Sequence, residues 1–509
     1  MPFNSIFAWV MKKRIHQIDL FRKYPIDVQN EWFEKLIANG VKTEFGQRHH
    51  FSSVHNYDDF KAKVPLQNYE DIQPYIDRLM AGEQGLLWPS ETKWFAKSSG
   101  TTSRRSKLLP VTKESLEECH YKGGKDLLAM YYDNHPNRKL YNGKHLIIGG
   151  SAQINQLSAD SYFGDLSAII VKNLPWWAEI RRTPAREIAL LSEWEEKIER
   201  MARSTIEQDI YIIAGVPSWT LVLVHRVLEI TGKKNLKEVW PNLELFMHGG
   251  VSFEPYRKQF EALIPDPEMH YVETYNASEG FFGIQDQVGG NEMLLMLDYG
   301  IFYEFIPMET FNGVDSQHIV SIEDVEVGVN YALVISTNGG LWRYILGDTI
   351  RFTSTSPYRF KITGRTKSFI NAFGEELIVE NAEMAIARAC ERTNAKMREF
   401  TACPVYMDDK LSGAHEWCIE FTHFPDDMER FRRVLDETLR ELNSDYDAKR
   451  YHNLILREPI IRTVPIGTFD QWLRSTGKLG GQHKVPRLAN DRMILEQILQ
   501  LMNQTEANA

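Results

Sequence analysis

Between residues 90 and 360, short apolar runs that end in glycine, serine or asparagine alternate with runs of helical periodicity. DIYIIAGVP, residues 209–217, has the length and composition of a buried strand, and TLVLVHRVLEI, residues 220–230, follows it with helical spacing. This alternation predicts an α/β architecture. Ligands of such sheets bind beyond the carboxyl ends of the strands, which is where the small and polar residues of this region occur.

The two flanks of this region have a different pattern. DVQNEWFEKLIANG, residues 27–40, predicts a helix with a glycine stop, and the first 90 residues are mostly helical in pattern. Beyond residue 366 the helix candidates at 380–393 and 426–443 enclose a strand candidate at 415–424, which is typical of a smaller α+β unit. We therefore predict an N-terminal domain of residues 1–366 and a C-terminal domain of residues 367–509.

The composition bounds the class of protein. The 509 residues are 43% hydrophobic and 12% aromatic, enough to bury large cores. A formal charge of -10 argues against a general nucleic-acid binder, which usually has a basic face. The four cysteines form no CxxC pair, so reduced thiols in a cytoplasmic protein are expected. We expect no signal peptide and no membrane span, because no run approaches about 18 apolar residues.

The stretch KSSGTTSRRSK, residues 97–107, predicts a phosphate-binding loop. Gly100 permits a close backbone approach, and successive backbone N–H groups in such a turn bind anions. Arg104, Arg105 and Lys107 add positive potential. The hydroxyl donors of the loop are Ser98, Ser99, Thr101 and Thr102. The stretch lacks the GxxxxGK[ST] pattern, which excludes a P-loop kinase or GTPase.

The second motif is YNASEG, residues 275–280, which follows a strand-like run. Tyr275 offers a ring face for a base, Ser278 a hydroxyl, and Glu279 a hard oxygen ligand suited to Mg²⁺. Taken alone, this motif fits an ordinary strand end equally well.

Three further stretches complete the set. Asp348, in YILGD, can bind both hydroxyls of a ribose, and Arg365, in TGRTKS, can donate to ribose or phosphate. Lys367 lies where the pattern changes and is a candidate hinge. Lys484, in GGQHKVPR, is a lysine on a glycine-rich stretch that can bring charge to a developing phosphate anion. Taken alone, each is also compatible with a plain turn or a solvated loop.

The order of these parts resembles the adenylate-forming superfamily of acyl and aminoacyl ligases, and within it most closely the GH3 family of acyl acid amido synthetases. The resemblance rests on SSGTT, YNASE and YILGD, and it extends to VPLQNYEDIQPYIDRLMAGEQGLLWPS and WPNLELFMHGG. It covers nearly the whole chain. It implies a large N-terminal adenylate-forming domain of mixed sheets flanked by helices, with a smaller, mobile α+β C-terminal domain.

The resemblance also implies roles in nucleotide binding. The hydroxyl loop would hold the ATP phosphates, Tyr275 would stack on adenine, and Ser278 would contact the α-phosphate. Glu279 would be the Mg²⁺ ligand. Asp348, assisted by Arg365, would hold the ribose hydroxyls. The residues expected to line the adenine and acyl pocket are Gly249 and Gly250.

The C-terminal domain supplies the expected catalytic lysine. Lys484 would contact the acyl carboxylate and the α-phosphate, and Lys478 is the competing candidate. The domain would turn about Lys367 between two half-reactions.

The implied activity is ATP-dependent adenylation of a carboxylic acid, followed by conjugation of the acyl group to an amino acid. The acceptor is left open between an amino acid, coenzyme A and a carrier protein. A catalytically silent nucleotide-binding protein is the alternative of another class. The chain is shorter than typical plant members, and its pocket segment GVPSWT, residues 215–220, matches no acid specificity, which predicts a bacterial relative with an open choice of acid. A monomer with no nucleic-acid or membrane partner is expected.

Overall fold

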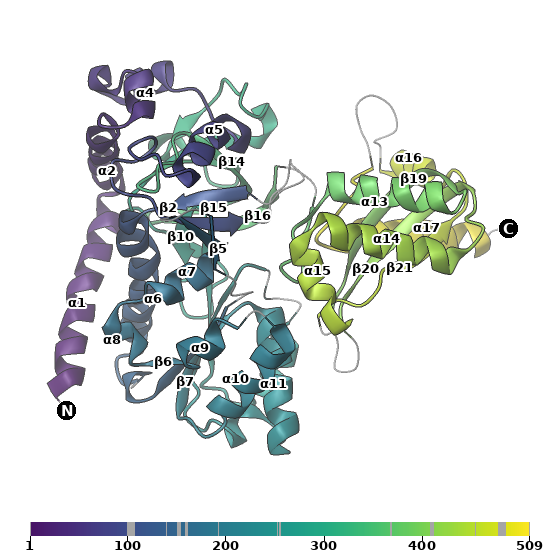
Figure 1. Cartoon of the computed structure of the whole chain (residues 1–509), viewed down its shortest axis with the longest axis horizontal. Coiled ribbons are helices and arrows are strands. Elements are labelled where there is room, and N and C mark those ends of the chain that lie inside the picture. The colour runs from purple at the N-terminus through teal and green to yellow at the C-terminus, as the bar shows by residue number, and fades with distance from the viewer. Residues whose placement is uncertain are drawn as a thin grey trace.

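The computed structural model describes most of the chain. The described residues are 2–98, 107–138, 140–149, 154–157, 161–191, 193–251, 253, 256–366, 369–407, 412–453, 455–476 and 485–507. They form a large N-terminal unit and a smaller C-terminal unit that lie side by side (Figure 1). The segment that joins the units includes Lys367, which is outside the described residues, so the domain boundary stays a prediction.

The first 80 residues are helical, as the sequence predicts. The helices are α1 (Pro2–Lys23), α2 (Pro25–Gly40), α3 (Glu44–Arg48), α4 (Tyr57–Lys63) and α5 (Tyr69–Met80). Local signals fix two of their starts. The Asn56 side chain caps α4, and Asn68 and Asp71 form a capping box at the start of α5. Helix α1 runs along the side of the N-terminal unit that is opposite the C-terminal unit (Figure 1).

A twelve-stranded mixed sheet is the centre of the N-terminal unit, in the order β13-β12-β14-β15-β16-β11-β10-β9-β8-β7-β3-β6. The strands from β9 to β6 are parallel, and those from β13 to β9 pair antiparallel. Their bounds are β3 (Lys144–Ile148), β6 (Arg182–Thr183), β7 (Ile210–Gly215), β8 (Leu245–Gly249), β9 (His270–Ala277), β10 (Gly280–Ile284), β11 (Met293–Leu295), β12 (Ile301–Pro307), β13 (Val320–Ser321), β14 (Asn330–Thr337), β15 (Tyr344–Thr355) and β16 (Tyr358–Arg365). The predicted α/β alternation is confirmed where β7 leads into its helix.

A second, four-stranded sheet has the order β2-β1-β5-β4. Its strands are β1 (Trp94–Ser98), β2 (Lys107–Val111), β4 (Asn155–Gln156) and β5 (Tyr162–Asp165). The remaining helices of the unit are α6 (Tyr121–Asn134), α7 (Leu166–Lys172), α8 (Trp176–Glu179), α9 (Arg186–Ala189), α10 (Trp194–Thr205), α11 (Pro217–Thr231) and α12 (Arg257–Leu263). Within the described residues, no helix combines the length and apolar composition needed to cross a bilayer.

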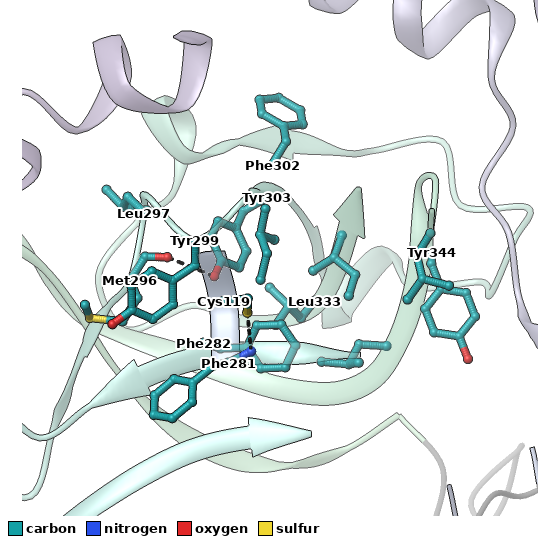
Figure 2. Packing of buried hydrophobic residues seen from close by; sticks show 14 of the residues in the cluster. Cys119, Phe281, Phe282, Met296, Leu297, Tyr299, Phe302, Tyr303, Leu333 and Tyr344 are labelled. Carbon is teal, nitrogen blue, oxygen red and sulfur yellow. Dashed lines mark hydrogen bonds between the residues drawn. The ribbon is translucent and has the colours of Figure 1, made fainter. Parts of the chain in front are cut away.

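The antiparallel part of the large sheet encloses an aromatic core, shown in Figure 2. Two hydrogen bonds lie inside this core. The Phe281 amide donates to Cys119 Sγ at 3.1 Å, and the Tyr303 hydroxyl donates to the Met296 carbonyl at 3.0 Å. Burying Cys119 in this way raises the pKa of its thiol to about 12, which keeps it protonated and inert.

The C-terminal unit is a small α+β sandwich. The sheet has the order β19-β20-β21, and its faces are covered by α13 and α14 on one side and by α16 and α17 on the other. A two-stranded ribbon, β17 with β18, precedes it. The bounds are β17 (Phe369–Ile370), β18 (Leu377–Ile378), α13 (Val379–Arg392), β19 (Lys396–Val405), β20 (Ala414–His423), α14 (Met428–Leu442), α15 (Ser444–Arg450), β21 (Ile460–Val464), α16 (Thr468–Ser475) and α17 (Met493–Ala507).

Candidate nucleotide and acyl-transfer site

Strand ends of both sheets of the N-terminal unit supply the predicted site residues. Tyr275 lies near the carboxyl end of β9, and Ser278 and Glu279 form the turn that follows it. Asp348 and Arg365 lie on the neighbouring strands β15 and β16. Ser98 ends β1 and pairs with Lys107 of β2, so the two described ends of the predicted hydroxyl loop lie opposite each other. Segments far apart in the chain thus contribute to one region.

Asp348 and Arg365 are directly paired across the sheet. Arg365 Nε donates to Asp348 Oδ1 at 2.6 Å, and the Tyr275 hydroxyl donates to Asp348 Oδ2. An ionised carboxylate can accept about four hydrogen bonds, so these two contacts leave room for ribose hydroxyls. The three residues form one hydrogen-bonded group that fixes the orientation of the carboxylate.

Tyr275 is deeply buried rather than exposed at a pocket wall. Its ring centroid lies 4.9 Å from that of Phe282 and 6.0 Å from that of Phe360. The structure therefore gives Tyr275 a defined polar role, to orient Asp348. Its expected stacking on adenine stays a prediction.

Glu279 lies in an electrostatically unusual place. Burial raises the pKa of its carboxyl to about 7, although Lys107 acts in the opposite direction. Burial likewise lowers the pKa of Lys107, whose strongest opposing influence is Glu279. Lys107 pairs in register with Ser98, so it stands at the base of the hydroxyl loop. Such shifted groups are typical of sites that bind charged ligands.

The remaining residues of the predicted loop and lysine motifs cannot be placed. Outside the described residues lie Ser99, Gly100, Thr101, Thr102, Arg104, Arg105, Lys367, Lys478 and Lys484. Only the two ends of the loop, Ser98 and Lys107, are described. The choice between Lys484 and Lys478 stays open.

Gly249 ends β8 and Gly250 follows it, and their role in lining a pocket stays a prediction. A side chain at Gly249 would approach the Thr274 carbonyl oxygen to 2.4 Å, so only glycine fits there. Gly250 has a φ of 81°, which favours glycine, and its carbonyl accepts from Asn371 Nδ2 at 3.3 Å. The second glycine thus faces the C-terminal unit.

Sequence patterns did not predict the turn between β17 and β18, residues 371–376, which contacts the N-terminal unit at this site. Glu376 pairs with Arg365 at 3.4 Å, and the Ser218 hydroxyl donates to the Phe373 carbonyl at 3.2 Å. Glu375 closes the turn on itself. Its carboxylate accepts from the Ala372 and Phe373 amides and contacts His415 Nε2 at 2.8 Å. The predicted pocket segment around Val216–Trp219 is thus covered by this turn.

Comparison with protein families decides the affiliation of the chain. Residues 14–269 match the GH3 family N-terminal domain, residues 294–365 its central domain and residues 380–493 its C-terminal domain. The chain belongs to the GH3 family. The family inferred from the sequence is thereby confirmed.

Two curated relatives of this GH3 chain come from Arabidopsis thaliana. Indole-3-acetic acid-amido synthetase GH3.4 is 24% identical over 93% of this chain and 91% of its own length. The 4-substituted benzoates-glutamate ligase GH3.12 is 24% identical over 90% of this chain and 92% of its own length. The relatives therefore span the same domains as this chain.

Solved structures show the same fold. The GH3.15 acyl acid amido synthetase in complex with 2,4-DB is 18% identical, with a TM-score of 0.61 over 97% of this chain and 96% of that one. A 2-hydroxyisobutyryl-CoA ligase is 12% identical, with a TM-score of 0.56 over 94% and 92%. The fold class predicted from the sequence, that of adenylate-forming enzymes, is confirmed.

Proposed function

We propose that this GH3 protein is an ATP-dependent acyl acid amido synthetase. The observation that carries the proposal is the group formed by Tyr275, Asp348 and Arg365 beside Glu279 and the base of the hydroxyl loop. In a GH3 chain, this group has the chemistry that ribose and phosphate require. The curated relatives named above, which are amido synthetases and an acid–amino acid ligase, support the same reading.

In the first half-reaction, a carboxylate oxygen of the acid attacks the α-phosphorus of ATP and pyrophosphate leaves. Asp348 holds the ribose hydroxyls, oriented by Tyr275 and Arg365. The hydroxyl loop grips the departing phosphates, and Lys484 stabilises the charge that develops. Ser278 contacts the α-phosphate.

Glu279 fits a Mg²⁺ ligand. Among the described residues no three His, Cys, Asp or Glu side chains gather into a metal cage. Mg²⁺ on a nucleotide needs only one or two carboxylates, because the phosphate oxygens supply other ligands. When bound, the ion neutralises charge on those oxygens. Burial raises the pKa of the Glu279 carboxyl to about 7, and a cation bound to it would offset the cost of ionising the buried group.

In the second half-reaction, the deprotonated amine nitrogen of an amino acid attacks the acyl carbon. The C–N bond forms, the bond from the acyl carbon to the phosphate oxygen breaks, and AMP leaves with the electron pair. The proton of the amine goes to solvent. The C-terminal unit, turning about Lys367, covers the intermediate and keeps water from it.

The finer properties belong to the same proposal. The protein acts in the cytoplasm, as expected for a chain without disulfide-type cysteine spacing, and as a monomer, which is the default for the family. Its source is bacterial, in contrast to the plant relatives named above.

The test is ATP–pyrophosphate exchange with a panel of carboxylic acids, followed by mass analysis of products formed with amino acids or with coenzyme A. We expect exchange with at least one acid and an amide product. A thioester in place of the amide would make the protein a coenzyme A ligase. ATP binding without exchange on any acid would favour the catalytically silent alternative.

The lysine assignment is tested in the same assay. Lys484→Ala should reduce exchange by at least about 100-fold, since one charge-stabilising group contributes about 3 kcal/mol to such a step. ATP binding should be largely kept. Near-normal exchange in this variant, with loss in Lys478→Ala, would transfer the role to Lys478.

A further inference from the structure

Lys449 is a buried lysine at the junction of the two units. It lies on α15, at the edge of the C-terminal unit that faces the N-terminal unit (Figure 1). Only 7% of the residue is exposed. Its Nζ lies 4.4 Å from the ring centroid of Trp219, in the predicted pocket segment of the other unit. A Cβ at Gly374 would lie 3.5 Å from Lys449 Cε, so the turn 371–376 also packs against the lysine side chain.

The ammonium of Lys449 lacks a bonded anion within the described part of the chain. Among the residues that the structure describes, no carboxylate is in ion-pair contact with it. Burial lowers its pKa, and the more distant carboxylates of Asp445, Asp165 and Glu375 offset this only in part. A buried ammonium is costly unless it is paired, and a cation–π contact returns about 0.5 to 2 kcal/mol. The position therefore favours an anion that arrives from outside the chain.

The surroundings of Lys449 connect it to the reacting groups. The turn 371–376 leads from Gly374 to Glu376, which pairs with Arg365. On the other side, Lys97 donates to the Ser444 hydroxyl at 2.9 Å, at the N-terminal end of α15. Lys97 precedes Ser98, where the hydroxyl loop begins. Lys449 thus lies beside two segments that lead directly to the nucleotide site.

We propose that Lys449 binds the carboxylate of the amine acceptor, with the Trp219 ring holding its ammonium in place. The inference rests on the proposed function and names the residue that recognises the carboxylate of its amino acid acceptor. The adenylate occupies the N-terminal unit, so the acceptor enters where the two units meet. An acceptor without a carboxylate gains nothing from Lys449.

The test compares two acceptors in one preparation. Hydroxylamine traps acyl-adenylates without needing a carboxylate, whereas the amino acid presents one. In Lys449→Met, which keeps the apolar stem and removes the charge, the ratio of kcat/KM for the amino acid to that for hydroxylamine should fall by about 10- to 100-fold, as expected for one charge-assisted hydrogen bond. Lys449→Arg should recover part of the loss. Lys396→Met, which removes an exposed lysine on β19, is the matched control and should leave the ratio unchanged.

Other outcomes would overturn the inference. An unchanged ratio in Lys449→Met, or an equal fall for both acceptors, would show that the lysine serves packing or the junction between the units. Wild-type protein provides a check that needs no variant. It should prefer the amino acid over the corresponding carboxamide by at least about tenfold, and equal use of both would contradict the proposal. Absence of pyrophosphate exchange in wild type would instead refute the proposed function itself.

Discussion

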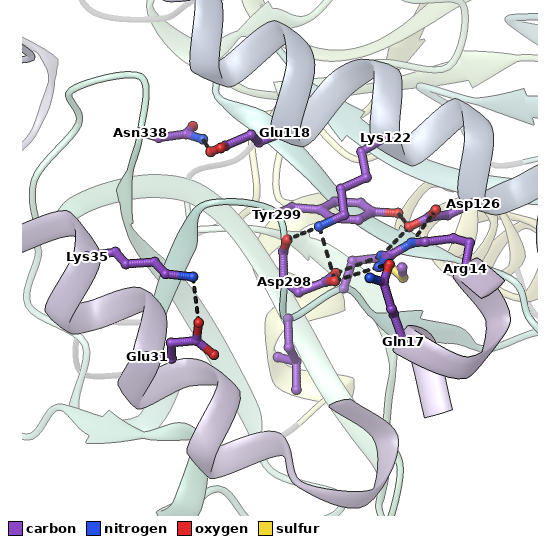
Figure 3. Close-up of polar contacts among 12 residues, drawn as sticks. Arg14, Gln17, Glu31, Lys35, Glu118, Lys122, Asp126, Asp298, Tyr299 and Asn338 are labelled. Atoms are coloured by element: carbon purple, nitrogen blue, oxygen red, sulfur yellow. Dashed lines mark hydrogen bonds and ion pairs between the residues drawn. The ribbon is translucent and has the colours of Figure 1, made fainter. Parts of the chain in front are cut away.

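Two regions of the N-terminal unit bury charge in opposite ways. Arg14 on α1 donates to both oxygens of Asp126, at 2.7 and 2.6 Å, and to both oxygens of Asp298, at 2.8 and 3.0 Å (Figure 3). Lys122 pairs with Asp298 at 3.1 Å, and the Tyr299 hydroxyl donates to Asp126 at 2.7 Å. At Asp298, Arg14 and Lys122 outweigh burial and keep the pKa below its ordinary value, whereas at Asp126 burial outweighs Arg14 and raises the pKa. These charges neutralise one another.

The nucleotide site leaves its charges partly uncompensated. Within the described part of the chain, neither Glu279 nor Lys107 is in an ion pair, and burial shifts the pKa of each toward its neutral form. The Arg14 network fastens a terminal helix to the sheet, so full pairing is an advantage there. A site that must bind phosphate and a metal ion needs charged groups that are not already in ion pairs. Buried charge is therefore structural where it is internally paired, and points to a ligand where it is not.

The largest effect is expected where the pairing is complete. Asp126→Ala leaves Arg14 with one carboxylate and leaves buried donors of Arg14 and Tyr299 without an acceptor. It should therefore lower the free energy of unfolding by about 3 to 5 kcal/mol. Denaturant-induced unfolding measures this change. Asp19→Ala, which removes an exposed partner of Arg22, should change the same quantity by less than about 0.5 kcal/mol. Equal changes in the free energy of unfolding of the two variants would contradict a structural role for the network.

At Glu279 we expect a substitution to reduce activity without reducing stability. Glu279→Gln should slow pyrophosphate exchange by about 100-fold, because a metal ligand contributes several kcal/mol to the transition state. The melting temperature should not fall, since the folded protein already disfavours the ionised carboxyl. A strongly destabilised variant would place Glu279 with the structural charges.

The pH dependence of the stability of Glu279→Gln tests the direction of the pKa shift at Glu279. The folded pKa of Glu279, about 7, lies above the ordinary value of 4.5, so this carboxyl destabilises the folded state only when it is ionised. Without nucleotide, wild type and Glu279→Gln should be equally stable near pH 4.5. Wild type should become progressively less stable than the variant up to about pH 7, and the gap should stay constant above that. A melting-temperature gap of the opposite sign would contradict the pKa shift.

Local patterns in the sequence predicted what depends on neighbours along the chain. The strand β7 and the helix α11 follow from period and end signals of a few residues. The site residues Tyr275, Glu279, Asp348 and Arg365 were found through the order of motifs, and the structure brings three of them into one hydrogen-bonded group.

Contacts between distant segments could not be predicted in this way. Glu376 meets Arg365, Lys449 meets Trp219 and Arg14 meets Asp126 only because separate elements pack together. Each of these residues has an ordinary local setting: a turn, an amphipathic helix end and a charged helix face. Nothing in the spacing of one segment specifies the partner in another, so the buried charges were the least predictable part of the molecule.

The smallest effect on stability is expected for a solvent-exposed ion pair between a basic side chain and a carboxylate. Lys35 Nζ lies 2.5 Å from Glu31 Oε1, one turn apart on α2, and both side chains are more than half exposed (Figure 3). Such a pair contributes about 0.3 to 0.5 kcal/mol, so Lys35→Ala should barely change the free energy of unfolding.

High salt separates the exposed ion pair from the buried network. In 1 M NaCl the effect of Lys35→Ala should vanish, because exposed charges are then screened within about 3 Å. The effect of Asp126→Ala should persist in the same salt, because solvent ions do not reach a buried network. If both effects disappeared together, the two kinds of ion pair would differ only in number of contacts and not in burial.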